Sequence, residues 1–294
     1  MKIKVPASSS NLGCGFDSVG FAVNLHLELE ILEPCERWEI MHHLGADIPQ
    51  DDTNLVISTA LKIAPDLTPH KIRMTSNIPL ERGLGSSSSA LVAGIELACA
   101  IGGMNLSTQV KLQLACSMEG HPDNVAPAIL GGLVVSTYCE GILEYVKMDM
   151  PDVGIVAYVP DYKLSTTAMR KVLPQELPFK EAVWASSISN VMVASLIKGD
   201  IVKAGRMIEQ ERFHERYRAR LVPELAQLRE IAHKHGAFAT YLSGAGSIII
   251  SLTPLEKTDE LMEIFSKNSN AEVLKLSFEP RGSHIYSCKK QIEC

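Results

Sequence analysis

The chain has 294 residues, of which 46% are hydrophobic and 21% are charged. This is enough apolar material for a folded core and excludes a disordered or fibrous protein, while a length about twice that of a common domain predicts two domains. The 28 Lys and Arg residues against 34 Asp and Glu residues give a net charge of -6. That balance does not supply the basic field of a sequence-independent nucleic-acid binder, so we expect no nucleic-acid partner.

No stretch approaches the roughly 18 to 20 uninterrupted apolar residues of a membrane span. Lys2 and Lys4 lead into polar residues 8–11 instead of an apolar signal core, so we expect a cytoplasmic protein without a membrane partner. No C-x-x-C pair occurs, and neither a disulfide framework nor a zinc site is expected. Reduced thiols are predicted for the seven cysteines, Cys14, Cys35, Cys99, Cys116, Cys139, Cys288 and Cys294.

The predicted elements begin with a strand at residues 3–5 and a second strand at residues 21–31. In the second strand apolar and polar side chains alternate, as in a half-buried antiparallel sheet. Residues 86–101 are rich in helix formers and begin with hydroxyl residues that can cap a helix. Ser107 is a candidate cap for another helix, which is expected to end at Gly120.

The second half of the chain is predicted to mix helices and strands, with a domain boundary near residues 155–165. Strands are expected at 130–135, 153–159, 237–242, 247–252 and 272–278, and helices at 182–198, 200–215, 223–235 and 255–267. A mixed order without strict strand–helix–strand repetition predicts an α+β fold.

Three glycine-rich loops carry the candidate chemistry, and the first spans residues 6–20. Gly13 and Gly15 permit backbone conformations closed to other residues, so Asn11 and Asp17 can be aimed into a pocket. A hairpin-like turn without a further role is the alternative.

The second loop, residues 78–90, places two glycines and a run of four serines directly before the predicted buried helix. Backbone N–H groups at a helix N-terminus form an anion site, and a serine hydroxyl is a natural magnesium ligand beside a triphosphate. The loop lacks the lysine of a Walker A motif, and Ser88 stands where a dinucleotide fingerprint has its third glycine. We therefore predict a phosphate cradle of another type, with a simple helix cap at Ser86 as the alternative.

The third loop, residues 241–249, lies between two apolar runs and has Ile249 in place of a third glycine. A dinucleotide site is again not indicated, and a tight hairpin stays open as the interpretation. Residues 121–128 contain no hydrophobic stripe that would place their polar members in a core. A turn capped by Asp123 or Asn124 is the alternative to a functional segment.

Two arginines and a threonine in the second half can be combined with Asp17. Thr166 and Arg170 are four residues apart, which on a helix puts a hydroxyl and a guanidinium on one face. Arg218 precedes a helix that is expected to begin after Pro223. Single surface arginines are usually solvated, but this set suits an amino acid, which offers a carboxylate to arginine and an ammonium to a carboxylate.

With these loops the sequence resembles the GHMP kinase superfamily. Residues 6–20, 79–89 and 242–246 are similar, in this order, to its substrate loop, its P-x-x-x-G-L-G-S-S phosphate loop and its C-terminal glycine motif. Within the superfamily the chain resembles the homoserine kinase family through the narrower matches at residues 8–17, 121–128 and 165–174. The resemblance spans nearly the whole chain.

The resemblance implies a two-domain GHMP kinase fold, with a ribosomal S5 domain 2-like domain at residues 1–158 and a ferredoxin-like domain at 159–294. It implies ATP-dependent phosphorylation of the L-homoserine hydroxyl to O-phospho-L-homoserine in threonine biosynthesis, with ATP and Mg²⁺, in a homodimer. The alternatives are a GHMP kinase for another small alcohol, such as mevalonate or a sugar, and a catalytically dead binding protein. Mevalonate has no ammonium for Asp17 to meet, which favours the amino acid.

The resemblance also implies residue roles. Asn11 and Asp17 would hold the amino and hydroxyl ends of homoserine, and two arginines would clamp its carboxylate region, Arg170 also reaching the transferring phosphoryl group. The implied substrate-binding residues are Asn11, Asp17, His121, Thr166, Arg170 and Arg218, with Asn124 and Arg170 as catalytic residues. The implied ATP-binding residues are Pro79, Leu80, Glu81, Arg82, Gly83, Leu84, Gly85, Ser86, Ser87, Ser88 and Ser89.

The metal ligands and the base are the least determined parts of the prediction. Ser87 is expected on magnesium with an acidic residue, for which Glu119 is the candidate, while another register would put Gln113 there. Phosphoryl transfer through a loose transition state needs alignment and cations more than a strong base. The resemblance places Asn124, which cannot act as a base, against the substrate, so the alcohol proton would pass to the phosphate or to water. Asp123 as the base is the alternative.

Overall fold

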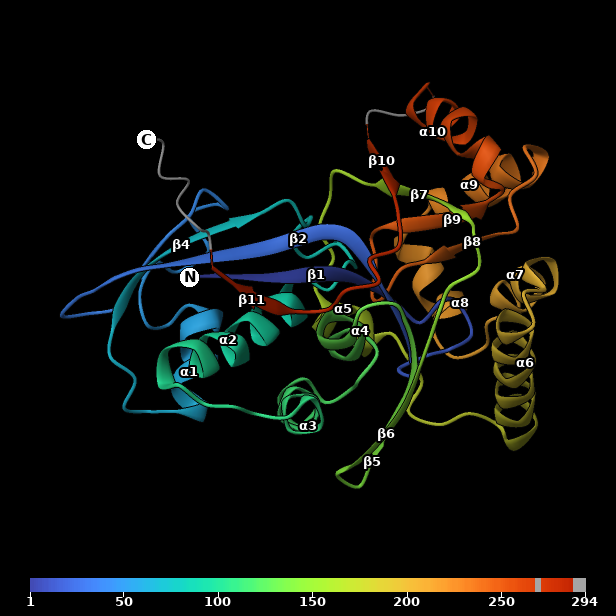
Figure 1. Ribbon diagram of the computed structural model, residues 1–294. Coiled ribbons are helices and arrows are strands. Elements are labelled where there is room, and N and C mark those ends of the chain that lie inside the picture. Colours follow the sequence, from blue (N-terminus) through green and yellow to red (C-terminus); the bar gives the residue numbers. More distant parts are fainter. Residues whose placement is uncertain (268–270, 288–294) are drawn as a thin grey trace.

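The computed structural model describes residues 1–267 and 271–287, which form two β-sheets with helices packed against them (Figure 1). The larger sheet contains β1 (Lys2–Ser10), β2 (Val19–Pro34), β3 (Glu39–Met41), β4 (His70–Ser76), β5 (Leu133–Cys139), β6 (Ile142–Met148) and β11 (His284–Tyr286). The smaller sheet contains β7 (Gly154–Val159), β8 (Ala239–Leu242), β9 (Ile249–Thr253) and β10 (Glu272–Leu276). Mixed sheets and helices confirm the predicted α+β class.

The helices are distributed over both sheets. They are α1 (Leu55–Ile63), α2 (Ser86–Gly102), α3 (Thr108–Glu119), α4 (Val125–Leu130), α5 (Thr166–Lys171), α6 (Phe179–Ile197), α7 (Ile201–Ile208), α8 (Glu215–Arg218), α9 (Glu224–Lys234) and α10 (Thr258–Lys267). Ser107 caps α3 as predicted, because its side chain accepts the N–H of Val110. None of the described helices combines the length and the apolarity that a membrane crossing requires.

The long strand β2 joins the two halves of the larger sheet. Its first residues pair with β5, its second half pairs with β4, and β1 runs antiparallel along both parts. The predicted alternation is confirmed, since Phe21, Leu27 and Leu29 are buried while Glu28 on the other face forms an ion pair with Lys4. The strand is longer at both ends than the pattern predicted.

Strand β1 extends beyond the predicted residues 3–5 and carries polar side chains toward the cavity described below. The register between β1 and β2 shifts at Pro6, which has no N–H to donate to the ladder. Beyond this bulge Ser8 and Ser10 still belong to the strand, and both are buried. The polar run that the sequence places in a loop is therefore the rigid end of a central strand.

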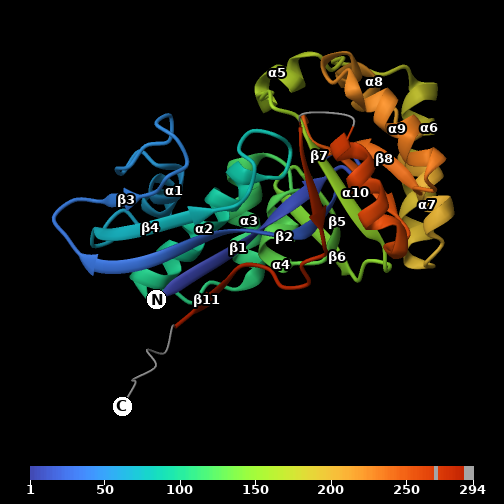
Figure 2. The same cartoon turned by 90° about the horizontal axis from the view of Figure 1, so that it is seen from above.

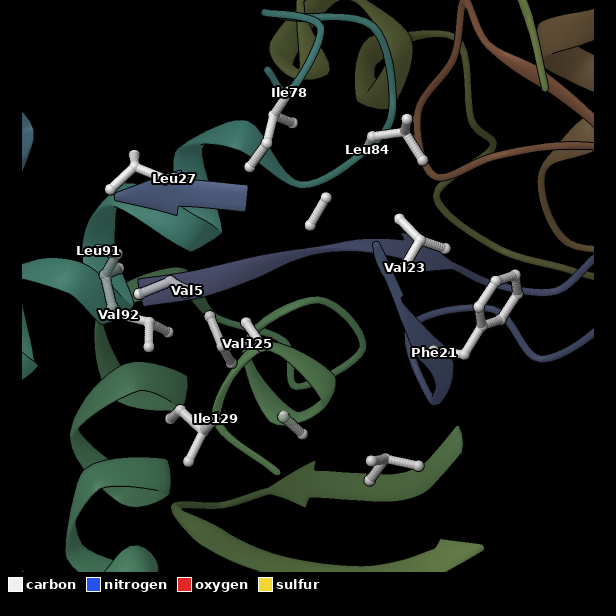
Figure 3. Close-up of a cluster of buried hydrophobic side chains, with 14 of the residues drawn as sticks. Val5, Phe21, Val23, Leu27, Ile78, Leu84, Leu91, Val92, Val125 and Ile129 are labelled. Carbon is white, nitrogen blue, oxygen red and sulfur yellow. The ribbon is translucent and has the colours of Figure 1, made fainter. Parts of the chain in front are cut away.

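Helix α2 packs against β1 and β2 and fixes the position of the phosphate loop. Leu91 and Val92 of this helix share one apolar cluster with Val5 and Leu27 of the strands (Figure 3). A β-carbon at Gly94 would lie 2.5 Å from the Val56 carbonyl oxygen of α1, so only glycine allows the two helices to approach this closely. Because α2 is buried along most of its length, its N-terminus is held firmly beneath the loop that precedes it.

The smaller sheet has the strand order β10-β7-β9-β8, and α9 and α10 pack on it, while α6 and α7 form an antiparallel pair at the outer edge (Figures 1 and 2). β8 and β9 form a hairpin around the third loop, which is one of the two interpretations of its sequence. The predicted boundary between 158 and 159 stays a prediction. Strand pairing places residues 154–158 in the smaller sheet, and it returns β11 to β1 of the larger sheet.

Two element predictions were wrong in their bounds. The strand expected at 130–135 begins only at Leu133, because residues 125–130 form α4 and the chain turns at Gly131 with φ 71°. The helix expected at 200–215 ends at Ile208. Glu211 then accepts the N–H groups that begin the separate helix α8, which breaks the predicted helix into two.

The cysteines of the described residues are free thiols, as the sequence predicts for a reduced protein: Cys14, Cys35, Cys99, Cys116 and Cys139. Three of them, Cys14, Cys99 and Cys116, are buried in or beside the core. Cys288 and Cys294 lie outside the described residues.

Candidate active site

The three glycine-rich loops and the segment before α4 converge on one cavity of about 320 Å³. The β1–β2 loop, the loop before α2 and the β8–β9 loop form its walls, and α5 and α8 close it from the side of the smaller sheet. All the residues predicted to meet the substrate line this cavity: Asn11, Asp17, His121, Asn124, Thr166, Arg170 and Arg218. Segments more than 200 residues apart in the chain thus supply one site.

Asn11 holds the first loop in shape. It lies in the left-handed region with φ 71°, which asparagine tolerates better than most residues, and it is 2% exposed. Its Oδ1 accepts the N–H of Asp17 at 3.0 Å, and its Nδ2 donates to the Gly244 carbonyl at 3.0 Å. Both ends of the amide are therefore engaged within the protein. The predicted contact of Asn11 with the substrate's amino end stays a prediction, while its contacts show that it positions Asp17.

Asp17 and Arg170 form a bidentate ion pair across the cavity. The two nitrogen–oxygen distances are 2.8 and 3.1 Å, the fork geometry that arginine and carboxylate share. Burial opposes the charge of Arg170, but Asp17 more than offsets this, and the pKa of Arg170 is raised above its ordinary value. Thr166 and Arg170 lie on the same helix α5, as their spacing predicts. Both charged side chains are about a third exposed, so a ligand can reach them.

Arg218 is a buried cation without a carboxylate partner among the described residues. It is 2% exposed, and its Nε and Nη1 donate to the carbonyls of Met169 and Gly244 at 3.2 and 3.0 Å. Burial, together with the positive charge of Arg170, lowers the pKa of Arg218 to about 10. Both guanidinium groups lie within 6 Å of the Phe16 ring, at 5.8 and 5.5 Å from its centroid. A desolvated cation that lines a cavity favours the binding of an anion there.

His121 and Asp123 form a hydrogen-bonded pair close to Asp17. The distance from Nδ1 to Oδ1 is 2.6 Å, and Asp123 is 2% exposed. Burial disfavours the imidazolium, but the hydrogen bond to Asp123 and the charges of Asp123 and Asp17 outweigh it, so the pKa of His121 is raised above 6.5. The surroundings of His121 therefore favour the protonated form of its ring more than water does.

Asn124 is held between two serines of β1. Its Oδ1 accepts the Ser8 hydroxyl at 2.9 Å, and its Nδ2 donates to the Ser10 hydroxyl oxygen at 3.0 Å. Although Asn124 occupies the N-cap position of α4, its side chain makes no capping bond, so the alternative of a simple cap is wrong for this residue. The amide is fixed at the cavity wall and has no acid–base capacity of its own.

The phosphate loop is fitted against the third glycine loop. Gly83 has φ 100°, and a β-carbon there would lie 2.3 Å from the carbonyl oxygen of Ser243. The Ser243 hydroxyl donates to the Gly83 carbonyl at 2.6 Å, and the N–H of Ile248 donates to the Arg82 carbonyl at 2.7 Å. Gly85, with φ 64°, then leads directly into α2. The two loops therefore form one rigid surface at the N-terminus of a buried helix, a geometry that suits an anion.

Most of the predicted ATP-binding residues line this surface, but three do not. Glu81, Arg82, Gly83, Gly85, Ser86, Ser87 and Ser88 line the main cavity, and Leu80 lines a neighbouring one. The Leu84 side chain packs into the apolar core (Figure 3), and the Ser89 hydroxyl donates to the Pro6 carbonyl at 2.9 Å. Pro79 also lies outside both cavities. For Pro79, Leu84 and Ser89 the assignment stays a prediction.

Glu119, at the end of α3, reaches the cavity beside the serines of the phosphate loop. Its Oε1 accepts the Ser88 hydroxyl at 2.6 Å, and Ser87 lines the same cavity. No cation of the described residues forms an ion pair with this carboxylate. Gln113, the alternative acid position, donates instead to the Gly141 carbonyl at 2.7 Å and lies off the cavity. Of the two candidates, Glu119 lines the same cavity as Ser87, whereas Gln113 does not.

A second group of ligand-type side chains is less suited to a metal. The potential ligand atoms of Asp17, His121 and Asp123 lie within 4.8 Å of one another. However, Asp17 is already bound by Arg170, and Asp123 by the His121 ring. The guanidinium groups of Arg170 and Arg218 line the same cavity and disfavour a further positive charge beside these three residues. Ser87 and Glu119 are therefore the better pair for a divalent cation.

An apolar cavity of about 560 Å³ lies on the other side of the phosphate loop. Leu27, Leu44, Ile48 and Met74 contribute to its walls. Leu80, Glu81, Ser86 and Ser87 line it from the phosphate loop, and the last three also line the main cavity. A flat aromatic group and a string of phosphates joined to it can therefore be accommodated on the two sides of one loop.

Sequence reasoning missed the residues that hold the arginines and the asparagine. The Phe16 ring lies near two guanidinium groups, and the wholly buried His214 contacts Arg218. Ser8 and Ser10 hold Asn124, although the sequence pattern gives them no role beyond a loop. The spacing of His214 and Arg218, four residues apart, was the available signal for their contact.

The buried His214 predicts a distinct acid dependence of stability. Burial, followed by the charge of Arg218, lowers its pKa from 6.5 to about 3. Between these values the unfolded chain binds a proton that the folded chain excludes, so the free energy of unfolding falls with falling pH by about 1.4 kcal/mol per unit. We expect His214→Gln to lose stability less steeply than the wild type in urea titrations from about pH 6 to about pH 4. Burial raises the pKa of Glu211 to about 7, but this residue is present in the wild type and in the variant alike. Parallel stability curves would show that His214 is not the depressed group.

Comparisons with known proteins agree with this geometry. The model for the GHMP kinases N terminal domain matches residues 54–132, and the model for the GHMP kinases C terminal matches residues 192–271. A homoserine kinase of Streptococcus sanguinis is 49% identical over 286 residues, which cover 97% of this chain and 99% of that protein. The chain belongs to the homoserine kinase family of the GHMP kinases. It is therefore a kinase.

Solved structures of GHMP kinases share the whole fold. The thrB protein of Listeria monocytogenes is 44% identical with a TM-score of 0.88, over 97% of this chain and 99% of that one. The homoserine kinase from Cytophaga hutchinsonii is 26% identical with a TM-score of 0.85, over 97% and 96%. The two-domain GHMP kinase architecture that the family resemblance implies is confirmed.

Proposed function

We propose that this GHMP kinase transfers the γ-phosphoryl group of ATP to the side-chain hydroxyl of L-homoserine, giving O-phospho-L-homoserine for threonine biosynthesis. The observation that carries the proposal is Arg218, a buried guanidinium that lines the cavity and lacks an anion among the described residues. The α-carboxylate of an amino acid supplies that anion. The names of the relatives at about half identity support the same substrate.

The opposite charge of the amino acid is met at Asp17. This carboxylate accepts two hydrogen bonds from Arg170 and keeps lone pairs that an ammonium group can use. Arg170 lines the same cavity as the phosphate loop, so it can hold negative charge on the substrate carboxylate or on the transferring phosphoryl group. A zwitterion therefore satisfies both signs of charge, whereas mevalonate offers no ammonium.

The nucleotide is accommodated by the phosphate loop and the apolar cavity beside it. The base would occupy the apolar side, and the phosphates would lie over the N-terminus of α2. Arg82 Nε is a buried donor without a partner among the described residues, as expected where a phosphate oxygen is to bind. Ser87 and the carboxylate of Glu119 would hold Mg²⁺, whose oxygen-ligand preference they meet. The bound ion would neutralise charge on the phosphates.

The protein's own contribution to the chemistry is alignment and charge stabilisation. Asn124, fixed by Ser8 and Ser10, would orient the attacking hydroxyl without removing its proton. The guanidinium group of Arg170 and the loop N–H groups would stabilise negative charge on the equatorial oxygens. The proton would leave to the phosphate or to water, so no side chain is required as a base.

Asp123→Asn tests this assignment of the proton. Because Asp123 already accepts a hydrogen bond from His121, it is poorly placed to accept the alcohol proton, and the variant should keep kcat within about tenfold of the wild type. Loss of a general base costs about 10²–10⁴-fold. A loss of that size with unchanged thermal stability, while Asn124→Asp keeps its rate, would identify Asp123 as the base.

The substrate is tested by coupled ADP release with MgATP and each of four alcohols: L-homoserine, L-serine, L-threonine and mevalonate. We expect turnover with L-homoserine far above the other three. Turnover with mevalonate instead would keep the nucleotide site and refute the amino-acid pocket. No turnover with any alcohol, in a protein that is stabilised by MgATP, would favour a binding protein.

The oligomeric state implied by the family resemblance stays a prediction. A homodimer would appear in light scattering as twice the 32.1 kDa mass of the chain. A monomeric mass would refute it without affecting the proposed reaction.

A further inference from the structure

A fully buried histidine lies directly behind the arginine that carries the proposed function. The Nδ1 atom of His214 is 3.1 Å from Nη1 of Arg218, and its Nε2 atom is 3.1 Å from the carbonyl oxygen of Gly13. The ring also stacks on Phe16, with centroids 5.1 Å apart and planes inclined by 23°. His214 is 0% exposed and does not line the cavity. It therefore contacts the first loop and Arg218, but it would not contact a substrate bound in the cavity.

The hydrogen bonds fix the protonation of this ring. A guanidinium group has donors only, so Nδ1 of His214 must accept from Arg218. The carbonyl of Gly13 is an acceptor, so Nε2 must carry the proton and donate. Both ring nitrogens are thus satisfied in one neutral tautomer, and an imidazolium would place two donors against each other at Arg218. This agrees with the strongly lowered pKa of the buried ring.

His214 is the one side chain among the described acceptors of Arg218. The other two acceptors are backbone carbonyls. Nε donates to the carbonyl of Met169, and the second proton of Nη1 is donated to the carbonyl of Gly244. These three contacts leave Nη2 without a hydrogen-bond partner among the described residues. The guanidinium is therefore held in one plane, with its free nitrogen available to a ligand in the cavity.

We propose that His214 is a positioning residue for substrate recognition: it orients Arg218 toward the carboxylate of the amino-acid substrate and couples that orientation to the first loop through Gly13. The inference rests on the proposed function, since it assigns Arg218 to the substrate carboxylate. It concerns discrimination between amino alcohols with and without a carboxylate, and not the phosphoryl-transfer step.

Two substitutions separate the two contacts of the ring. His214→Gln keeps a donor near the position of Nε2 and removes the acceptor facing Arg218. His214→Asn keeps an acceptor near the position of Nδ1 and removes the donor to Gly13. The exposed His233, which pairs with Glu209 on the protein surface, provides the matched control His233→Gln.

The experiment compares L-homoserine with 3-amino-1-propanol, which is the same molecule without its carboxylate. For His214→Gln we expect kcat/KM for L-homoserine to fall about 10–100-fold, mainly through KM, as for the loss of a hydrogen bond to a charged group. The value for 3-amino-1-propanol and the KM for ATP should stay within about twofold, because neither involves Arg218. His214→Asn should restore most of the discrimination, and His233→Gln should match the wild type.

A double-mutant cycle gives an independent readout. If His214 acts through Arg218, His214→Gln should have almost no further effect in an Arg218→Gln background. Equal losses for both alcohols, a raised KM for ATP, or additive effects in the cycle would show a merely structural role and overturn the inference. Failure of the wild type to phosphorylate L-homoserine would instead refute the proposed function, and with it the carboxylate assignment.

Discussion

Replacing Arg170 with alanine is expected to lower kcat/KM for L-homoserine by about 10²–10³-fold, the usual cost of removing a preorganised charge donor from an active site. Arg170 lines the cavity on α5 and binds both carboxylate oxygens of Asp17. Its loss removes the cation proposed to contact the transferring phosphoryl group, and it releases the carboxylate proposed for the substrate ammonium. Both kcat and KM should therefore change, as measured by coupled ADP release at saturating MgATP.

The matched control is Arg73→Ala, which removes an equal charge from an exposed ion pair with Glu30 on the larger sheet. Exposed pairs contribute about 0–1 kcal/mol, so activity and stability should hardly change. Arg170→Lys separates charge from geometry, because lysine keeps the charge and loses the bidentate fork. If Arg170→Ala stays within about threefold of the wild type, the arginine is an electrostatic neighbour and not part of the catalytic machinery.

Gly83→Ala is expected to have the second large effect, on nucleotide binding. A β-carbon at this position would lie 2.3 Å from the Ser243 carbonyl oxygen, and the residue has φ 100°. The methyl group must push the phosphate loop away from the β8–β9 loop, and a displacement of about 1 Å can cost about 10²-fold in rate. We expect the stabilisation by MgATP in thermal-shift measurements to be lost, together with most of kcat/KM.

Gly103→Ala is the control for the backbone strain alone. Gly103 ends α2 with φ 62°, and no heavy atom lies within 4 Å of its virtual β-carbon. Alanine there should cost about 1–2 kcal/mol of stability through the left-handed conformation and leave ATP binding intact. Similar behaviour of the two variants would mean that the contact between the two glycine loops does not support the nucleotide site.

The sequence predicts the chemistry of the site better than its mechanics. Glycine loops and hydroxyl runs are local patterns, so the phosphate loop can be predicted from the residues alone, whereas the roles of Asp17 and Arg170 are implied by the family resemblance. Thr166 and Arg170 both lie on α5, and their four-residue spacing places them on one face of that helix. The metal-ligand ambiguity between Glu119 and Gln113 cannot be resolved in this way, because it depends on where α3 ends.

The missed features depend on contacts between distant segments. Ser8 and Ser10 resemble loop residues because alternation of polar and apolar side chains, the usual sign of a strand, is absent where both faces of a strand are buried. His214 gives only a weak signal, since its two partners lie 201 residues and four residues away. Tertiary packing also decides that the helix predicted at 200–215 is broken, because the buried carboxylate of Glu211 satisfies the N–H groups of α8.

The proposed function explains why the buried charge of Arg218 is retained. Taking an unpaired guanidinium out of water is unfavourable, and stability alone would favour an apolar side chain at this position. The carbonyls of Met169 and Gly244 and the ring of His214 compensate only part of that cost. In the proposed function a substrate carboxylate would compensate the remaining cost, so part of the binding free energy would come from the burial of this charge.

The most direct test of the central claim is the identity of the product, measured by ³¹P NMR in a mixture of the protein, MgATP and L-homoserine. We predict a new phosphomonoester signal that couples to the two protons of one methylene group and grows in equal amount with ADP. Release of inorganic phosphate alone, or a phosphomonoester that forms with mevalonate but not with L-homoserine, would contradict phosphorylation of the homoserine hydroxyl.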